Sequence, residues 1–401
     1  MTVGTSLPRD EHAGAAAYRE QIALLAETLP SALADGDLSA FYDVFRSTEL
    51  PFVAAAHARQ PGPLLRLCFE ILHRLGAISP ATALAIENHY YVTSAIATAP
   101  LADGDARDAR RRLLSVIEER RVLVANTSSK VHASRLGAIG TSARRRGDGF
   151  RVNGTAAYMS LATEADVLVF ITQIADEGPA IFAIEPLHDN PSIEIGPYLF
   201  PEAMLDSDTH RVTFHDLDLR ADALLVGPRD AHARAFIAFE MAWHQLLIPA
   251  LYLGAAAGAI EEVRRFARAT RARDDQPLAE VDGMVADVGR MAIEYRSACA
   301  TVLRAGDRLA AVRRFPDDLG ALEHAVDDAG VAKYVGTRCA EAVVGAARRI
   351  VGPRSFTGGQ LLERLSQEAM FGPLGPEVSS VIERRHGRRA LREDPFLEQW
   401  W

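Results

Sequence analysis

Two stretches of the chain indicate the fold. One is Ser207-Asp208-Thr209, followed by Phe214 and Asp216, and the other is Asn153-Gly154 upstream. Asn153-Gly154 closes the run Gly147-Asp148-Gly149-Phe150-Arg151-Val152-Asn153-Gly154, which is typical of a β-hairpin. Both stretches lie in a β-rich middle third, and helical sequence lies on either side of it. This order of helices, strands and helices predicts a multidomain α+β protein.

Helical periodicity marks the first third of the chain. Apolar residues recur at steps of three and four, as at Leu64, Leu65, Cys68, Ile71 and Leu72, which predicts a helical domain over residues 18–121. Residues 1–17 are rich in glycine, alanine and charge, and we expect them to form a mobile leader.

Short strands are predicted over residues 122–229, because each apolar stretch there is bounded by Gly, Pro, Asn or Asp. The candidates are Val122, Val124 and the ranges 150–152, 167–174, 180–184, 193–195 and 212–214. Helical periodicity returns near residue 230, and we expect an antiparallel bundle over residues 230–395 before a tail at 396–401. The predicted breaks between its helices are Gly306-Asp307, Phe315-Pro316 and Gly352-Pro353.

Composition and charge exclude several classes of protein. The 401 residues are 48% hydrophobic and 24% charged, as in a soluble globular protein. The net charge of −9 argues against a nucleic-acid partner, which needs a basic surface. We expect the basic runs Arg110-Arg111-Arg112 and Arg144-Arg145-Arg146 to lie on solvated faces.

The three cysteines, Cys68, Cys299 and Cys339, fit no metal-binding spacing, so no metal site and a reducing cytoplasm are expected. The first residues lack the apolar stretch of a signal peptide. The longest apolar run, Leu246 to Ile260, is too short to cross a bilayer and predicts a buried core helix. A membrane partner is therefore not expected.

Several of these stretches resemble the acyl-CoA dehydrogenase superfamily over roughly residues 20–395. They are Leu72-x-x-Leu75-Gly76, the helix that ends in Glu87-Asn88-His89, and Ser207-Asp208-Thr209 with the Asn153-Gly154 turn. The resemblance implies an N-terminal helical domain, a middle β-barrel or sandwich and a C-terminal four-helix bundle. It also implies bound FAD in a homodimer or homotetramer.

The resemblance assigns flavin contacts to the middle domain. The family places an aromatic residue four positions after the Asn-Gly turn and a hydroxyl two further on, which here are Tyr158 and Ser160. An aromatic face can pack on the flavin ring and a hydroxyl can bond its polar edge. Upstream, the resemblance assigns Thr127 to the flavin pyrimidine edge. The family's hydroxyl near the pyrophosphate falls on Ala133, so the adjacent Ser134 is the candidate for that contact. The alternative is that Tyr158 is a strand residue with a buried ring and that Ser160 is a surface serine.

The dinucleotide end of the cofactor is assigned to the C-terminal bundle. The run Arg349 to Phe356 resembles a turn that approaches the dinucleotide of a neighbouring subunit, with Gly352 for close backbone approach and Arg354 for a phosphate. Arg271 falls near the family's flavin-phosphate arginine. A solvated loop arginine is an equally good interpretation of Arg354.

Two residues compete as the proton-transfer group. The family's glutamate position falls on Pro376, and Glu377 comes one residue later, where a helix start also explains a glutamate. The family's second position, on the first long C-terminal helix, falls on His244, which can act as acid or base or be a core histidine beside Trp243. His89 and His210 are lower-ranked candidates.

Three functions remain open. The preferred one is an FAD-dependent α,β-dehydrogenation of an acyl thioester, on coenzyme A or a carrier protein, in a specialised pathway. The alternative is a flavin-dependent monooxygenase of the same fold that hydroxylates carbon, nitrogen or sulfur, and the third is a non-catalytic binding relative. The Ser207-Asp208-Thr209 element and the spacing of the middle domain favour the dehydrogenase.

Overall fold

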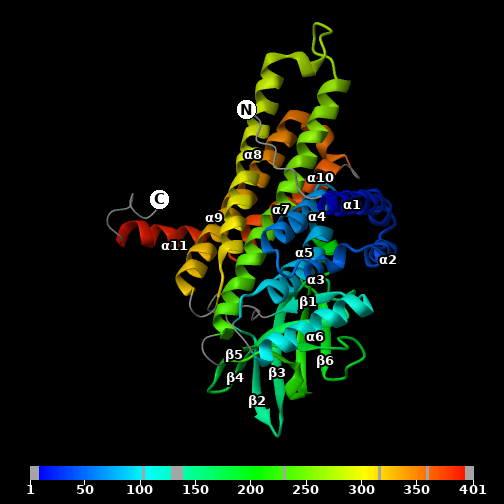
Figure 1. The fold of residues 1–401 in the computed structure, drawn as a ribbon. Helices are drawn as coiled ribbons and strands as arrows, with labels where there is room; N and C mark the ends of the chain where they lie inside the picture. The colour runs from blue at the N-terminus through cyan, green and yellow to red at the C-terminus, as the bar shows by residue number, and fades with distance from the viewer. Residues whose placement is uncertain are drawn as a thin grey trace.

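The computed structural model describes residues 9–101, 104–127, 139–228, 232–314, 318–357 and 361–392. Figure 1 shows a sheet at one end of the molecule and long helices that extend away from it. The predicted order of helices, strands and helices is confirmed. Ser134, the Phe315-Pro316 break, the first eight residues of the leader and the tail at 396–401 lie outside the described residues.

Helices form the region before the sheet. They are α1 (Arg9–Asp35), α2 (Ser39–Ser47), η1 (Leu50–Phe52), α3 (Val53–Ala56), α4 (Pro61–Gly76), α5 (Pro80–Thr98) and α6 (Asp105–Arg120). Because α1 begins at Arg9, residues 9–17 are helical rather than part of the expected leader, and their alanines favour this conformation.

The start of α5 is fixed by its sequence. Ser79 caps it, with its hydroxyl accepting the Thr82 N–H at 3.1 Å, and Pro80 occupies the first turn. At the other end Arg110, expected on a solvated face, is buried instead and donates to the carbonyls of Ile96 and Ala99. Its guanidinium satisfies carbonyls that the end of α5 would leave unpaired.

The middle region is one mixed sheet in the order β6-β7-β3-β2-β4-β5-β8, with β1 parallel to β4. Its strands are β1 (Val124–Thr127), β2 (Thr141–Arg146), β3 (Gly149–Met159), β4 (Val167–Ile174), β5 (Gly178–Ile184), β6 (Ile193–Tyr198), β7 (His210–Leu219) and β8 (Leu224–Val226). The predicted hairpin is β2–β3, in which Arg146 pairs with Gly149.

Ion pairs connect β2, which is not among the separate strands that the sequence predicts, to other parts of the sheet region. Arg145 bonds Glu177 at 2.6 Å, and Arg146 bonds Asp218 at 3.0 Å. Glu177 lies in the turn between β4 and β5, and Asp218 lies on β7, on the far side of β3 from β2. Residues 144–146 are exposed, as expected for a run of arginines on a solvated face.

The C-terminal region is helical. It contains α7 (His232–Ala269), η5 (Leu278–Glu280), α8 (Asp282–Ala311), α9 (Leu319–Val351), η6 (Gly352–Phe356), α10 (Leu361–Ala369), η7 (Gly372–Leu374) and α11 (Ser379–Arg392). The break at Gly352 is confirmed. The one at Gly306 is wrong, because Gly306 lies inside α8 where a Cβ would meet Leu65 at 2.6 Å, so its glycine serves packing.

Helix α7 is the core helix that the sequence predicts. It is long and apolar enough to cross a membrane, but 78% of its most apolar window is buried inside the protein. It crosses α4 closely at two glycines: a Cβ on Gly254 would meet the His73 carbonyl oxygen at 2.2 Å, and one on Gly76 would meet the Leu251 oxygen at 2.1 Å. The crossing fixes α7 between α4, α5 and α9.

Candidate active site

A polar cluster lies where α5, α7 and β1 meet, in surroundings that are otherwise apolar. Helix α5 is alanine-rich and nearly all of its side chains are buried, yet it carries Glu87, Asn88 and Tyr91 toward α7 and β1. Helix α7 supplies Glu240 and His244, which lie one turn apart and so share a face.

The centre of the cluster is a hydrogen bond between His244 Nδ1 and Glu87 Oε1 at 3.0 Å. The Glu87 side chain is 1% exposed and that of His244 is 13% exposed. The ring of Tyr91 packs edge-on against the imidazole, with centroids 4.9 Å apart. Within the described part of the chain, no residue hydrogen-bonds Nε2 of His244, so this nitrogen is available to a substrate.

The same cluster holds β1 in place. Asn126 donates its side-chain amide to Glu240 Oε1 at 2.9 Å and its backbone N–H to Asn88 Oδ1 at 2.6 Å. Burial raises the pKa of Glu240 to about 8. Glu240 is therefore protonated near neutral pH. Burial also raises the pKa of Glu87, and His244 partly offsets this effect.

Glu377 lies in a different environment. Its Oε2 accepts from Arg385 and, at 3.5 Å, from Gln245. Lys333 donates to the Gly375 carbonyl at 3.1 Å, and burial lowers its pKa to about 8, against the opposing effect of Glu377. Gln245 follows His244 by one residue and points to a different face of α7, so the structure does not bring the two candidate bases together.

The wall of the middle region is built from predicted flavin residues. Thr127 donates its hydroxyl to the Ala157 carbonyl at 2.9 Å, which ties β1 to the residue before Tyr158. Tyr158 has a φ of 62°, a conformation rare for aromatic residues, and its ring stays 44% exposed beside Phe200. An exposed aromatic face in a strained conformation is typical of a ligand contact.

Hydroxyl groups connect Ser160 to the Ser207-Asp208-Thr209 element. The Ser160 hydroxyl lies 2.8 Å from that of Thr209, which lies 2.7 Å from that of Ser207. Asp208 accepts the Thr163 N–H at 2.7 Å and also contacts His210. The element that the sequence singled out is thus the support of this wall.

His210 is held between two acceptors. Its Nε2 lies 3.0 Å from Asp208 Oδ1 and its Nδ1 lies 2.7 Å from the Gly196 carbonyl. Two bonds to acceptors require both ring nitrogens to carry protons. Burial opposes the charge, but the hydrogen bonds to Asp208 and Gly196 outweigh it, and the pKa of His210 is raised.

His210→Gln should therefore destabilise the protein in a pH-dependent way. Because the folded pKa lies above the ordinary 6.5, the stabilisation is fully present below that pH and is lost as pH rises through the folded value. We expect a loss of about 1 kcal/mol or more near pH 6, and less near pH 9. Thermal melts at both pH values measure it. His215→Gln, which removes an exposed pair with Glu194, should change little, and an equal loss in both variants would contradict the assignment.

His89, a lower-ranked candidate, is structural in this geometry. Its Nδ1 accepts the Val124 N–H at 3.0 Å and its Nε2 donates to the Pro51 carbonyl at 2.7 Å. Burial lowers the pKa of His89 to about 4, so the ring is neutral.

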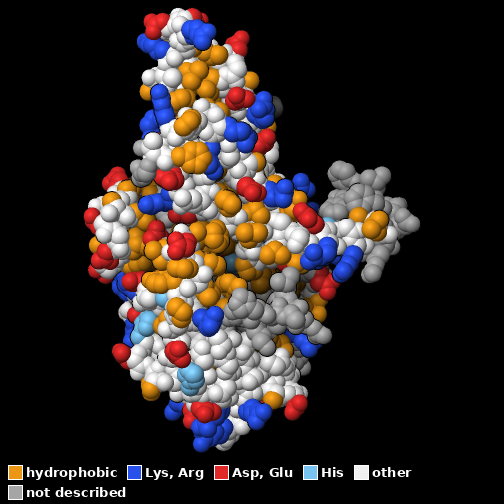
Figure 2. Space-filling model, turned by 180° about the vertical axis from the view of Figure 1, so that it is seen from behind, with side chains coloured by type: hydrophobic (Ala, Val, Ile, Leu, Met, Phe, Trp, Pro, Cys, Tyr) orange, Lys and Arg blue, Asp and Glu red, His pale blue; other side chains and the backbone are white. Residues whose placement is uncertain are grey.

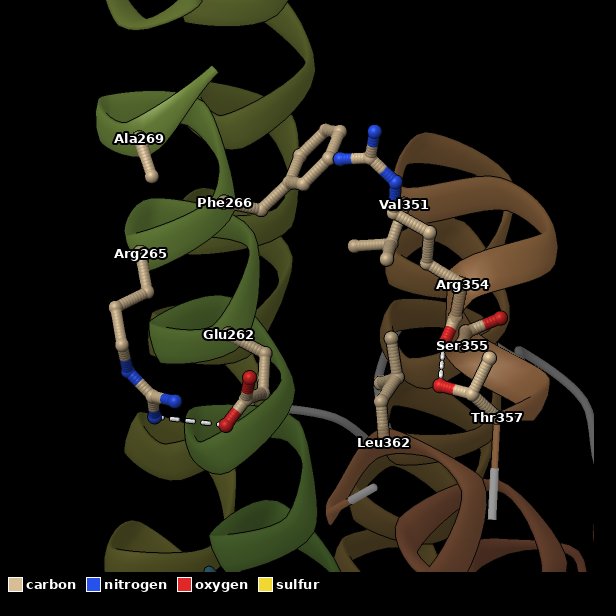
Figure 3. A pocket seen from close by; sticks show the side chains of 9 residues that line it. All are labelled: Glu262, Arg265, Phe266, Ala269, Val351, Arg354, Ser355, Thr357 and Leu362. Atoms are coloured by element: carbon tan, nitrogen blue, oxygen red, sulfur yellow. Dashed lines mark hydrogen bonds and ion pairs between the residues drawn. The ribbon is translucent and has the colours of Figure 1, made fainter. Parts of the chain in front are cut away.

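A second site lies at the far half of α7, between that helix, η6 and α10 (Figure 3). The pocket has a volume of about 420 Å³, and it is lined by Glu262, Arg265, Phe266, Ala269, Val351, Arg354, Ser355, Thr357 and Leu362. The Arg354 guanidinium lies 5.7 Å from the centre of the Phe266 ring. Gly352 has a φ of 68°, which glycine adopts without strain.

Arg271 does not line this pocket. It lies past the end of α7, where its guanidinium donates to the Asp275 carbonyl at 2.7 Å. Of the residues predicted to hold the dinucleotide, Arg354 lines the pocket, Gly352 lies next to the lining residue Val351, and Arg271 is bound within its own turn.

Sequence reasoning missed Glu87, Tyr91, Asn126 and Glu240 as site residues. A signal existed in the four-residue spacing of Glu240 and His244, which places a carboxyl and an imidazole on one helix face. A second signal was a charged residue at Glu87 within the apolar run of α5.

Comparisons with known proteins agree with this architecture. The family model for the acyl-CoA dehydrogenase C-terminal domain matches residues 235–375. The putative acyl-CoA dehydrogenase YdbM of Bacillus subtilis (strain 168) is 26% identical over 316 residues, which are 77% of this chain and 78% of that protein.

Two solved structures share the fold. Butyryl-CoA dehydrogenase from Megasphaera elsdenii has a TM-score of 0.78 at 15% identity and covers 97% of this chain and 100% of its own. Dibenzothiophene monooxygenase TdsC from Paenibacillus sp. A11-2 has a TM-score of 0.77 at 18% identity, covering 93% and 96%.

The class of protein is thus a helix–sheet–helix fold that a dehydrogenase and a monooxygenase share. The chain belongs to the acyl-CoA dehydrogenase superfamily, as its sequence motifs predict, and it is an oxidoreductase of that flavoprotein family. Flavin is its cofactor.

Proposed function

We propose that this protein is an FAD-dependent dehydrogenase that removes the α-proton and the β-hydride of an acyl thioester carried on coenzyme A or a carrier protein. One observation supports it most: His244 is held at Nδ1 by Glu87 and presents a free Nε2 at the junction of α5, α7 and β1. An imidazole in this arrangement can accept a proton near neutral pH.

Each residue of the site has a separate role in this reaction. His244 Nε2 takes the substrate α-proton, and the Tyr91 ring limits rotation of the imidazole. Trp243, next to His244 on α7, is fully buried. When bound, the flavin supplies the acceptor for the hydride.

The residues present fit a flavin. Tyr158 offers an exposed aromatic face for the ring, Thr127 fixes the adjoining strand, and Ser160 retains hydrogen-bonding capacity beside Thr209. The pocket at Arg354 and Phe266 offers a cation and an aromatic face to the phosphate and adenine of a dinucleotide. We propose that this pocket receives the dinucleotide end of a neighbouring subunit's FAD.

Arg354→Ala should lower the affinity for FAD about tenfold to a hundredfold, because it removes a charged contact to phosphate. Affinity for FMN, which lacks the adenosine phosphate, should stay nearly the same. Titration of the flavin-free protein followed by fluorescence measures both. Arg271→Ala is the matched control, since Arg271 is bound to Asp275, and it should change FAD affinity less. An equal loss for FAD and FMN in Arg354→Ala would argue against the pocket.

A homo-oligomer is part of this proposal. Hydrophobic side chains gather in a band across the middle of the rear face (Figure 2). Helix α8 exposes 54% of Val285 and 68% of Ile293, and exposed apolar surface of this kind often marks a protein contact. We propose a dimer or tetramer in the cytoplasm, without nucleic-acid or membrane partners.

A monooxygenase is the second candidate, and the environment of Glu377 favours it. The residue next to the family's glutamate position is engaged by Arg385 and Gln245, so it is not free to accept a proton from a thioester. The two functions separate after anaerobic reduction. A dehydrogenase is bleached by an acyl-CoA thioester and reacts slowly with oxygen. A monooxygenase is reduced only by an added reductant and then consumes oxygen with hydroxylation of its substrate.

A further inference from the structure

Glu87 is a buried charge that folding alone does not explain. It sits in the middle of α5, after Ala85 and Ile86, and its side chain is 1% exposed. Burying a carboxyl group is unfavourable unless a partner compensates it.

Its contacts point to a single partner. Oε1 bonds His244 Nδ1 at 3.0 Å, while Oε2 is buried with no hydrogen-bond partner among the residues that the structure describes. Burial raises the pKa of Glu87, and His244 partly offsets this effect. The carboxyl group is thus directed at the imidazole.

We infer that Glu87 is the positioning residue of His244, an inference that rests on the proposed function. By accepting the Nδ1–H, the carboxylate holds the ring in the tautomer whose Nε2 carries the lone pair, and it stabilises the imidazolium formed afterwards. In that step the substrate C–H bond breaks, an N–H bond forms at Nε2, and the electron pair stays on the substrate carbon.

The neighbouring groups are compatible with this role. Tyr91 faces the pair from α5 and Glu240 from α7, while the residue of β1 in the cluster is the neutral Asn126. Because the pKa of Glu240 is raised to about 8, Glu240 does not compete with Glu87 as a carboxylate near neutral pH. Glu87 is the carboxyl group of the cluster that bonds His244.

The test is Glu87→Gln in the flavin-loaded protein. The amide keeps the size of the side chain but can donate to Nδ1, which moves the proton to Nε2, the nitrogen that should act as base. We expect flavin reduction by an acyl-CoA thioester to slow about a hundredfold or more. The acid side of the pH–rate profile should also change, because the carboxyl of the pair no longer titrates. Nitrogen NMR of ¹⁵N-histidine-labelled protein, with His244→Ala for assignment, should show His244 leaving the Nδ1–H tautomer.

Glu368→Gln is the matched control. Glu368 is also buried and also bonds α5, through the Ala81 N–H at 2.8 Å, but it does not touch His244. It should lower the melting temperature and leave the pH–rate profile and the His244 tautomer unchanged. Glu87→Asp keeps the carboxyl group and should retain part of the rate that Glu87→Gln loses. It replaces Glu87→Gln in this test if the glutamine variant does not fold.

Two results separate the possible failures. If His244→Ala is inactive while Glu87→Gln keeps the wild-type rate, profile and tautomer, the proposed function stands and the role of Glu87 is refuted. If His244→Ala is fully active, His244 is not the base and this part of the proposed function fails, and the tautomer measurement on the wild type and Glu87→Gln still decides whether Glu87 orients the ring.

Discussion

His244→Ala is expected to slow flavin reduction by an acyl thioester by at least about a hundredfold, the usual cost of losing a general base. The reason is geometric: the variant removes the nitrogen that the structure leaves free at the junction of α5, α7 and β1. Anaerobic stopped-flow absorbance of the bound flavin measures the rate. Flavin content and melting temperature should be checked first, because His244 also anchors Glu87.

Glu377→Gln is the comparison for this prediction. The amide can keep a contact to Gln245 but loses the ion pair with Arg385, so we expect some loss of stability and a much smaller loss of rate. The reverse ranking, with equal flavin content, would identify Glu377 as the base and refute the assignment to His244.

Gly254→Ala is expected to destabilise the protein by about 3 kcal/mol or more, or to prevent folding. The new Cβ would lie 2.2 Å from the His73 carbonyl oxygen and 2.9 Å from the Ala77 nitrogen. These are backbone atoms of α4 and the turn after it, so relief requires the two helices to separate rather than one side chain to rotate. Soluble yield and thermal melting measure the effect.

Gly289→Ala is the matched control for this second prediction. Gly289 lies inside α8, and a Cβ there would meet nothing within 4 Å. Alanine favours a helix over glycine by about 1 kcal/mol, so this variant should melt at the same temperature or higher. Equal behaviour of the two variants would show that the crossing of α4 and α7 is not tightly packed.

Local patterns predicted much of the fold. Periodicity located the helical and β-rich regions, and the apolar run Leu246 to Ile260 is the buried centre of α7. The sequence does not list β2 as a strand because its arginines are not apolar, and their partners Glu177 and Asp218 are distant in the chain. Gly306 was taken for a break because a sequence does not reveal that Leu65 needs the space.

The candidate site was only partly predictable for the same physical reason. The family's second base position predicts His244, and the spacing after Asn153-Gly154, a pair that lies inside β3 rather than in a turn, predicts Tyr158. Glu87 lies 157 residues from His244 in the chain, and only the packing of α5 on α7 brings them together. Arg271 was assigned by position alone, and a hydrogen bond to Asp275 within its own turn draws it away from the pocket.

The most direct test of the central claim is the exchange of a substrate α-proton with solvent. An acyl-CoA thioester whose β-carbon bears no hydrogen can lose its α-proton but cannot be oxidised, so proton transfer is seen alone. Proton NMR in D₂O follows the loss of the α-signal with wild-type protein and both variants. We predict exchange with the wild type and Glu377→Gln and none above background with His244→Ala. Exchange at the wild-type rate in His244→Ala would contradict the account.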